Sequence, residues 1–179
     1  MARYDVRSLR SDDFEALSQL ERDVFGAMGE AVLCPHYLRL CTDFYNETSF
    51  IAYDDGRPVG YLLCFLKGRQ AYCTTLAIRE EYQRKRVTAM LIGAFVRSIV
   101  DNCDECFFTV KEDNKAARAL HAMLGASEIG MKYDFYGPGD QRILSRIDRA
   151  GFDRMRPKYE RLGFVDPQPA PSTEAVVAA

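Results

Sequence analysis

The segment from Tyr72 to Val100 constrains the fold more than any other part of the chain. It opens with YCTTLAI (72–78), a β-branched and aromatic run of strand length. It closes with a stretch whose apolar residues recur at helical spacing, namely Val87, Leu91, Phe95 and Ile99. The short loop between the two holds Arg84, Lys85 and Arg86. The pattern therefore predicts a strand, a basic loop and a half-buried helix in direct succession.

A strand that feeds a loop into a helix N-terminus forms a natural anion site, because the first amide N–H groups of a helix lack intrahelical partners. Three cations at that point oppose the helix dipole, which favours negative charge there. A bound phosphate would explain the arrangement. The alternative is an ordinary crossover whose basic loop is simply solvated.

Length and composition predict one folded domain over residues 1–165, followed by a Pro/Ala-rich, disordered tail over residues 166–179. The chain has 47% hydrophobic and 28% charged residues, which is typical of a soluble globular protein. A net charge of -2 gives no indication of a nucleic-acid partner. No apolar run has the length of a membrane span, and the N-terminus has no signal-peptide core. We expect a cytoplasmic protein with no nucleic-acid or membrane partner.

The cysteines do not indicate a disulfide framework or a metal site. Cys64 and Cys73 lie inside apolar runs and are predicted to be small core residues. Cys103 and Cys106 form a CxxC motif, but no second pair at zinc spacing accompanies it. Its acidic surroundings would raise a thiol pKa, so we interpret it as an inert connection and expect no metal.

The order of predicted elements indicates an α/β protein with a mixed, mostly antiparallel sheet of about seven strands flanked by helices. The predicted strands are residues 4–9, 49–53, 59–66, 72–78, 106–110, 129–136 and 142–147. The predicted helices begin near Ser11, Pro35, Val87, Asn114 and Phe152. Gly125 is expected to end the helix that Asn114 caps.

Two local motifs in this order resemble those of the GNAT superfamily, acyltransferases that move an acyl group from coenzyme A to an amine. The family's Gln/Arg-x-x-Gly-x-Gly/Ala loop corresponds to QRKRVT (83–88). The family's Asn-x-x-Ala-x-x-Leu-Tyr-x-x-x-Gly-Phe corresponds to NKAARALHAMLGA (114–126). The resemblance extends over most of the chain, from about Val6 to Ile147.

The sequence departs from the family pattern at four positions. Arg86 and Thr88 replace the two glycines of the loop, where glycine allows close approach to a pyrophosphate. Arg86 fits only if its backbone stays helical and its guanidinium contacts phosphate. In the second motif, His121 replaces tyrosine and Ala126 replaces the final phenylalanine.

The resemblance implies acetyl-CoA as the acyl donor and assigns residues to it. The amides of Arg84, Lys85, Arg86, Val87 and Thr88, with Gln83 beside them, would hold the pyrophosphate. The strand end formed by Leu76, Ala77 and Ile78 would pair with the pantetheine arm, and one amide there would polarise the thioester carbonyl. Asn114 would bind the same arm, or serve only as a helix cap, and Ala117 would leave room for it.

Catalysis requires one group to take a proton from the amine and another to protonate the thiolate. Many family members place a carboxylate on the strand before the loop, but this strand has none. His121 stands where the family has its acidic tyrosine, so an imidazolium is the first candidate acid. Tyr133 and Tyr136 are alternative acids, unless they serve only packing.

The acceptor is expected to be a primary amine of a small molecule or peptide, bound between residues 34–45 and 133–140. Three acids in these segments, Asp43, Asp134 and Asp140, would attract a cationic amine. Two other functions remain open: a non-catalytic acyl-CoA-binding protein, and an acyltransferase that uses a different acyl-CoA or an acyl carrier protein. The sequence does not fix the oligomeric state, and a homodimer is one option.

Overall fold

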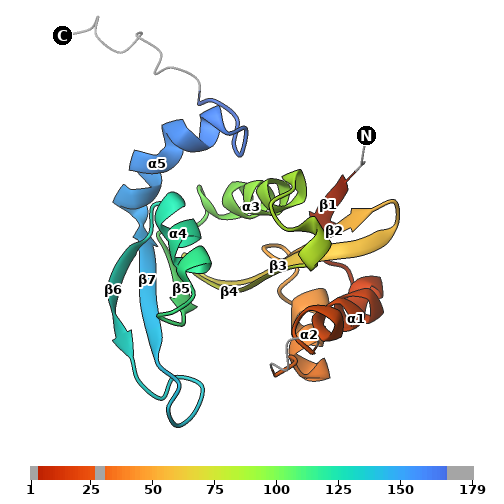
Figure 1. Cartoon of the computed structure of the whole chain (residues 1–179). Helices are drawn as coiled ribbons and strands as arrows, with labels where there is room; N and C mark the ends of the chain where they lie inside the picture. Colours follow the sequence, from red (N-terminus) through yellow and green to blue (C-terminus); the bar gives the residue numbers. More distant parts are fainter. Residues whose placement is uncertain (1–3, 27–30, 169–179) are drawn as a thin grey trace, which may run out of the picture.

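The structure is a computed structural model that describes residues 4–26 and 31–168 (Figure 1). Its strands are β1 (Tyr4–Ser8), β2 (Phe50–Asp54), β3 (Arg57–Lys67), β4 (Gln70–Ile78), β5 (Glu105–Val110), β6 (Ser127–Lys132) and β7 (Arg142–Asp148). Its α-helices are α1 (Phe14–Val24), α2 (Pro35–Asp43), α3 (Arg86–Ile99), α4 (Lys115–Met123) and α5 (Arg149–Arg161). Two 3-10 turns, η1 (Ser11–Asp13) and η3 (Glu80–Tyr82), precede α1 and α3.

The strands form one seven-stranded sheet in the order β1-β2-β3-β4-β5-β7-β6. The pair β4 and β5 is parallel, because α3 carries the chain across between them, and the other five pairs are antiparallel. The mixed, mostly antiparallel sheet that the sequence predicts is therefore confirmed.

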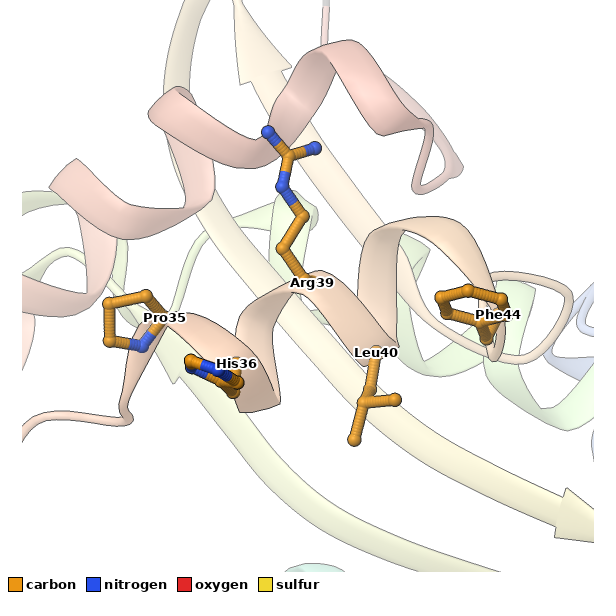
Figure 2. Close-up of a pocket in the computed structure, with 5 residues that line it drawn as sticks. All are labelled: Pro35, His36, Arg39, Leu40 and Phe44. Carbon is orange, nitrogen blue, oxygen red and sulfur yellow. The ribbon is translucent and has the colours of Figure 1, made fainter.

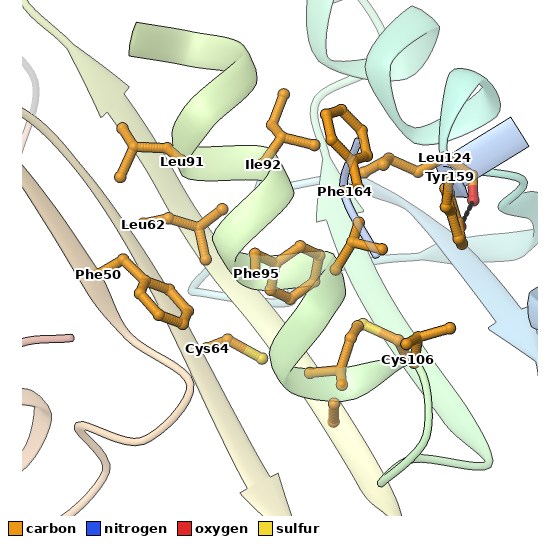
Figure 3. Packing of buried hydrophobic residues seen from close by; sticks show 14 of the residues in the cluster. Phe50, Leu62, Cys64, Leu91, Ile92, Phe95, Cys106, Leu124, Tyr159 and Phe164 are labelled. Carbon is orange, nitrogen blue, oxygen red and sulfur yellow. Dashed lines mark hydrogen bonds between the residues drawn. The ribbon is translucent and has the colours of Figure 1, made fainter. Parts of the chain in front are cut away.

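Helices cover the central strands on both faces, which explains why β3 is almost continuously apolar. On one face, Val59, Leu62 and Cys64 pack under α3 (Figure 3). On the other face, Tyr61 and Leu63 pack against α1 and α2. Every one of these side chains is 2% exposed or less.

The C-terminal helix α5 supports α4 and the far end of α3. The Tyr159 hydroxyl donates to the carbonyl oxygen of Leu124 at 2.6 Å, so α5 is fixed to the end of α4 (Figure 3). The Phe164 ring lies against Gly93 of α3, where an added Cβ would meet it at 3.0 Å. A glycine at this point therefore lets α3 approach the C-terminal segment closely.

A buried carboxylate joins the first strand, the first helix and the sheet. Asp13 accepts two hydrogen bonds from the Arg7 guanidinium, at 2.6 and 2.7 Å, and one from the Tyr53 hydroxyl at 2.7 Å. It also accepts from the Arg10 amide at 2.8 Å. Burial alone would raise the pKa of the Asp13 carboxyl, but the hydrogen bonds from Arg7 and Tyr53 outweigh burial and hold the pKa below its ordinary value.

Two predicted boundaries were wrong. The strand expected to reach Tyr136 ends at Lys132, because Asp134 adopts a left-handed φ of 51° and its side chain accepts from the Gly139 amide. Residues 133–141 are consequently a loop. The last helix begins at Arg149 rather than Phe152, because the Asp148 side chain caps it by accepting from the Gly151 amide at 2.8 Å.

The CxxC motif begins in the connection from α3 to β5 with Cys103 and ends inside β5 with Cys106, and both cysteines are fully buried. Burial raises the pKa of the Cys103 thiol to about 11, which leaves it protonated and unreactive. The structure thus agrees with an inert connection. Within residues 4–26 and 31–168, no cluster of histidine, cysteine and acidic side chains could hold a metal ion.

The predicted tail begins at Asp166, and its residues from 169 onward lie outside the described part of the chain. Among the helices described, none is long and apolar enough to cross a membrane.

The Asp13 network generates a pH-dependent prediction. We expect Asp13→Asn to lower the free energy of unfolding by about 3 kcal/mol at pH 7, since it leaves Arg7 without its charged partner. Because the folded pKa of Asp13 is lowered, its contribution is present above the ordinary pKa of an aspartate and is lost as pH falls. Urea unfolding at pH 7 and pH 3 should show the difference shrinking in acid. The exposed Asp153→Asn serves as control, and an equal loss in both variants would contradict the prediction.

Candidate active site

The centre of the sheet splits where β4 and β5 stop pairing. The two strands pair from Gln70 with Glu105 to Cys73 with Phe108, and β4 then continues to Ile78 paired with β3 only. A β-bulge causes the separation: Leu63 faces Thr75 and Cys64 faces Cys73, so Thr74 has no partner in β3. A bulge of this kind bends its strand and increases its twist. The outer edge of this half of β4 is left without a strand beside it.

The basic loop lies at the end of this unpaired edge. Arg84 adopts a left-handed φ of 61°, and this turn aims the following backbone into α3. Arg86 is the first residue of α3, with ordinary helical backbone, so replacing glycine there causes no strain. Among the described residues, the amides of Arg86 and Val87 have no hydrogen-bond acceptor, while the Thr88 amide donates to the Lys85 carbonyl oxygen at 3.2 Å. The helix thus begins with amides that can bind an anion.

The three cations of this loop are exposed, and none pairs with a carboxylate of the described chain. Lys85 lies over the Tyr82 ring, 4.7 Å from its centroid. The Tyr82 hydroxyl in turn donates to Asp54 at 3.0 Å, which ties the loop to the β2–β3 hairpin. The loop is therefore anchored while its positive charge remains uncompensated.

The strand end and the loop are joined by Gln83, whose side-chain amide donates to the Ile78 carbonyl oxygen at 3.4 Å. Ala77 and Ile78 are buried, and Leu76 is half-buried against the core under α3. The predicted cofactor residues of the strand thus form one continuous edge with the predicted cofactor loop.

The second motif forms the opposite wall of the split. Asn114 caps α4 as predicted, since its side-chain oxygen accepts from the Ala117 amide at 3.0 Å. Gly125 ends the helix with a left-handed φ of 87°, also as predicted. The side-chain NH₂ of Asn114 has no acceptor in the described structure and can donate to a ligand.

His121 lies on α4 with its ring 4.5 Å from the Phe108 ring, and Phe108 is the residue of β5 at which pairing with β4 stops. The imidazole Nδ1 is buried and has no hydrogen-bond partner in the described chain. Burial lowers the pKa of His121 to about 4, against a weaker opposing effect of Glu128. The ring is therefore neutral at physiological pH, and the imidazolium expected from the sequence is not the form that the structure supports.

A cluster of hydroxyl groups occupies the other side of the split. The Tyr72 hydroxyl lies 2.7 Å from the Thr109 hydroxyl and 2.6 Å from the Tyr136 hydroxyl. The Tyr37 hydroxyl donates to the bulged Thr74 at 2.9 Å. Burial raises the pKa of Tyr72 above its ordinary value, so this phenol stays protonated. These side chains come from α2, β4, β5 and the loop before β7.

Of the two tyrosines predicted as alternative acids, the structure brings only Tyr136 to this cluster. Tyr133 is 70% exposed and makes no side-chain hydrogen bond within the described residues. The physical reason is the left-handed turn at Asp134, which separates the two tyrosines instead of leaving them on one strand.

The acids expected to attract an amine are engaged elsewhere. Asp43 pairs with Arg39 on α2, and Asp140 makes a two-point ion pair with Arg142 at 2.7 Å. Asp134 accepts from the Gly139 amide at 2.7 Å. These carboxylates shape α2 and the β6–β7 loop, and the sequence-based expectation of an acidic acceptor site is not supported.

Two hollows lie near these elements. One, of about 370 Å³, follows the sheet beside the hydroxyl cluster and includes Tyr72, Thr109 and Phe135 among its lining residues. The other, of about 440 Å³, lies on the outer face of α2, where Leu40 and Phe44 project away from the helix (Figure 2). The second hollow contains no residue of β4 or α3, so it is separate from the split.

Sequence reasoning missed Thr74 and Tyr72 as residues of the site. Tyr72 and Thr74 carry no local signal, because a bulge depends on the register between β3 and β4. Tyr37 lies in the segment 34–45 that was expected to border the acceptor, but its hydrogen bond to Thr74 of β4, 37 positions away, was not predicted.

A split parallel pair beside a helix whose first amides can bind an anion is suited to a ligand with an anionic group and an extended arm. The sequence profile of the acetyltransferase (GNAT) family matches residues 6–126 of the chain. The chain therefore belongs to the GNAT family of acetyltransferases, as its motifs indicate, and is an N-acetyltransferase of that family.

Individual relatives are distant. An N-alpha-acetyltransferase of Saccharolobus solfataricus is 22% identical over 155 residues, covering 79% of this chain and 90% of the relative. The ribosomal-protein-S18-alanine N-acetyltransferase of Escherichia coli superposes with a TM-score of 0.69 at 16% identity, over 82% of this chain and 94% of the other. A diaminobutyrate acetyltransferase of Paenibacillus lautus, solved with L-2,4-diaminobutyric acid and coenzyme A, gives 0.67 at 17% identity, over 83% and 96%. The solved structures confirm the fold.

The environment of His121 generates a prediction that NMR can check. We expect the His121 ring resonances to stay unchanged from pH 8 to pH 5.5 and to titrate near pH 4. Because the folded pKa is lowered, neutral His121 contributes stability above about pH 6.5, and this contribution is lost as pH falls toward 4. His121→Gln should therefore lose less stability than the native protein over that interval. His36→Gln identifies which ring is observed, and titration of His121 between pH 6 and 7 would contradict the burial argument.

Proposed function

We propose that the protein transfers an acetyl group from acetyl-CoA to a primary amine of a peptide or small molecule. The observation that carries this proposal is the split between β4 and β5, which ends at the unpartnered amides of α3. A thioester placed in the split would have its carbonyl carbon open to attack from the face of the hydroxyl cluster. The relatives named above, which include a ribosomal-protein-S18-alanine N-acetyltransferase and a diaminobutyrate acetyltransferase, support the reaction class.

Different residues of the chain would contact different parts of the cofactor. The amides of Arg86 and Val87, with the side chains of Arg84, Lys85 and Arg86, would hold the pyrophosphate. The free edge from Leu76 to Ile78 would pair with the pantetheine arm as an added strand, and the Asn114 NH₂ would meet the arm from α4. An amide of this edge would hydrogen-bond the thioester oxygen as negative charge develops there.

The amine must reach the thioester unprotonated, and the split offers no carboxylate to take its proton. Along residues 74–78 the side chains are Thr74, Thr75 and three apolar residues. The hydroxyls of Tyr72, Thr109 and Tyr136 lie within hydrogen-bond distance of one another, and Tyr72 and Thr109 also line the open groove. We propose that this cluster orients the amine and passes its proton to the solvent in the groove, rather than storing it on one base.

His121 is proposed as the group that meets the leaving sulfur, in its neutral form. A neutral imidazole still carries one N–H, and this N–H can donate a hydrogen bond to the thiolate, which then takes its proton from solvent while the ring stays neutral. The Nδ1 atom has no hydrogen-bond partner among the described residues, which is consistent with a ring that interacts with a bound ligand. His121→Ala should lower turnover and leave coenzyme A affinity nearly unchanged, and normal turnover would remove it from the mechanism.

The direct test is release of the coenzyme A thiol from acetyl-CoA in the presence of a panel of amines and peptides. Acceptor-dependent release supports acetyl transfer. Binding of acetyl-CoA by calorimetry without release for any acceptor would instead support a non-catalytic acyl-CoA-binding protein.

The loop generates a binding prediction with a matched control. Arg86→Ala removes one exposed cation at the first position of α3, and we expect it to weaken coenzyme A binding about tenfold. Arg97→Ala removes the same side chain near the opposite end of the same helix and should leave affinity unchanged. Equal affinity of both variants, measured by calorimetry, would show that Arg86 makes no contact with the cofactor.

A further inference from the structure

The groove beside the hydroxyl cluster has an electrostatic character that the acetyl-transfer chemistry does not require. Its floor is apolar and aromatic, and includes Phe65, Phe107 and Leu144. Its charged lining residues are Lys67, at the end of β3, and Lys132, at the end of β6. No carboxylate lines the groove.

Neither lysine has a carboxylate partner among the described residues. The acids that flank Lys132 in sequence are engaged with other groups: Glu128 pairs with Arg118, and the Asp134 side chain accepts from the Gly139 amide. The polar residue Gln70, which also lines the groove, donates to Glu105 at 3.3 Å. The groove therefore presents two uncompensated ammonium groups above an aromatic floor, which is complementary to a ligand with apolar and anionic parts.

The positions of the lysines indicate how long such a ligand is. Lys67 pairs with Gln70, the first residue of β4. The amine must reach the split near Leu76, which lies six residues further along the same strand. At about 3.3 Å per residue, these two positions on β4 are roughly 20 Å apart. A free amino acid carries its carboxylate next to its amine and cannot reach both points. An extended peptide reaches Lys67 with an acidic side chain roughly four residues from its N-terminal amine, allowing for the length of the lysine.

We propose that this groove binds an acidic peptide segment, with its N-terminal amine at the split and its carboxylates near Lys67 and Lys132. This inference rests on the proposed acetyl transfer and names its acceptor class: a protein or peptide whose first residues include glutamate or aspartate. The aromatic floor would contact the apolar parts of the same segment, and Tyr136 would border the end where the amine enters.

The test compares three peptides that share one sequence except at positions three to five, which are all glutamate, all glutamine or all lysine. For the native protein we expect kcat/KM with the glutamate peptide to exceed that with the glutamine peptide by about three- to tenfold, as two exposed charge pairs would give. The lysine peptide should be the poorest. Raising the salt concentration should reduce the difference, because exposed charges are screened.

Charge-reversal variants tie the preference to these residues. In Lys67→Glu combined with Lys132→Glu, the preference should disappear or reverse toward the lysine peptide, with acetyl-CoA affinity unchanged. Arg154→Glu combined with Arg161→Glu, an equal charge change at two exposed positions of α5, should keep the native preference. Equal rates for the glutamate and glutamine peptides would overturn the proposal while leaving acetyl transfer standing. Faster acetylation of free acidic amino acids than of every peptide would overturn it as well.

If no peptide or amine is acetylated, the proposed acetyl transfer is wrong, but peptide binding still tests the acidic peptide site. Calorimetric titration of the glutamate and glutamine peptides into the protein saturated with coenzyme A then gives the answer. Tighter binding of the glutamate peptide, lost in the double lysine variant, would support an acidic peptide site. Equal binding of the two peptides would overturn it.

Discussion

The β-bulge in the middle of β4 determines where everything else in the site can lie. It places one more residue on β4 than on β3, with Thr74 as the unpaired member. The strand then bends away from β5, so the parallel ladder stops at Cys73 and Phe108. The backbone edge beyond that point is free because no strand can follow it. The loop and the start of α3 come directly after this edge, so a pairing surface and an anion site are joined by chain connectivity alone.

Both ends of the split leave basic side chains without a carboxylate partner among the described residues. On the cofactor side, Arg84, Lys85 and Arg86 are held near one another by a loop that Tyr82 and Gln83 anchor, and their charge is left uncompensated. Such an arrangement costs stability unless an anion binds. On the acceptor side, the carboxylates form ion pairs and turns, and lysines remain unpaired. The protein therefore offers positive charge to both of its proposed ligands.

Features set by short-range chemistry could be predicted from the sequence, and features set by register could not. Asn114 and Gly125 were recognisable because a cap and a left-handed helix end depend on single residues. The lowered pKa of His121 could not be predicted, since it results from burial of the ring, which packs beside Phe108 of a different strand. Nor was the separation of Tyr133 from Tyr136, which depends on a left-handed turn at Asp134, an uncommon conformation for a residue other than glycine.

The bulge also bears on how sequences with this architecture can diverge. An insertion of one residue opens the split by changing the number of positions on β4, and it places few demands on which side chains occupy them. Residues of other types could replace Thr74 and Thr75 and keep this geometry, provided that the number of residues on β4 is unchanged. Substitutions along β4 would then change the side chains that line the split without closing it. Deletion of a single residue would let β4 run beside β5 and would remove the split. The number of residues on β4, rather than the chemistry of their side chains, thus sets whether the sheet opens at this point.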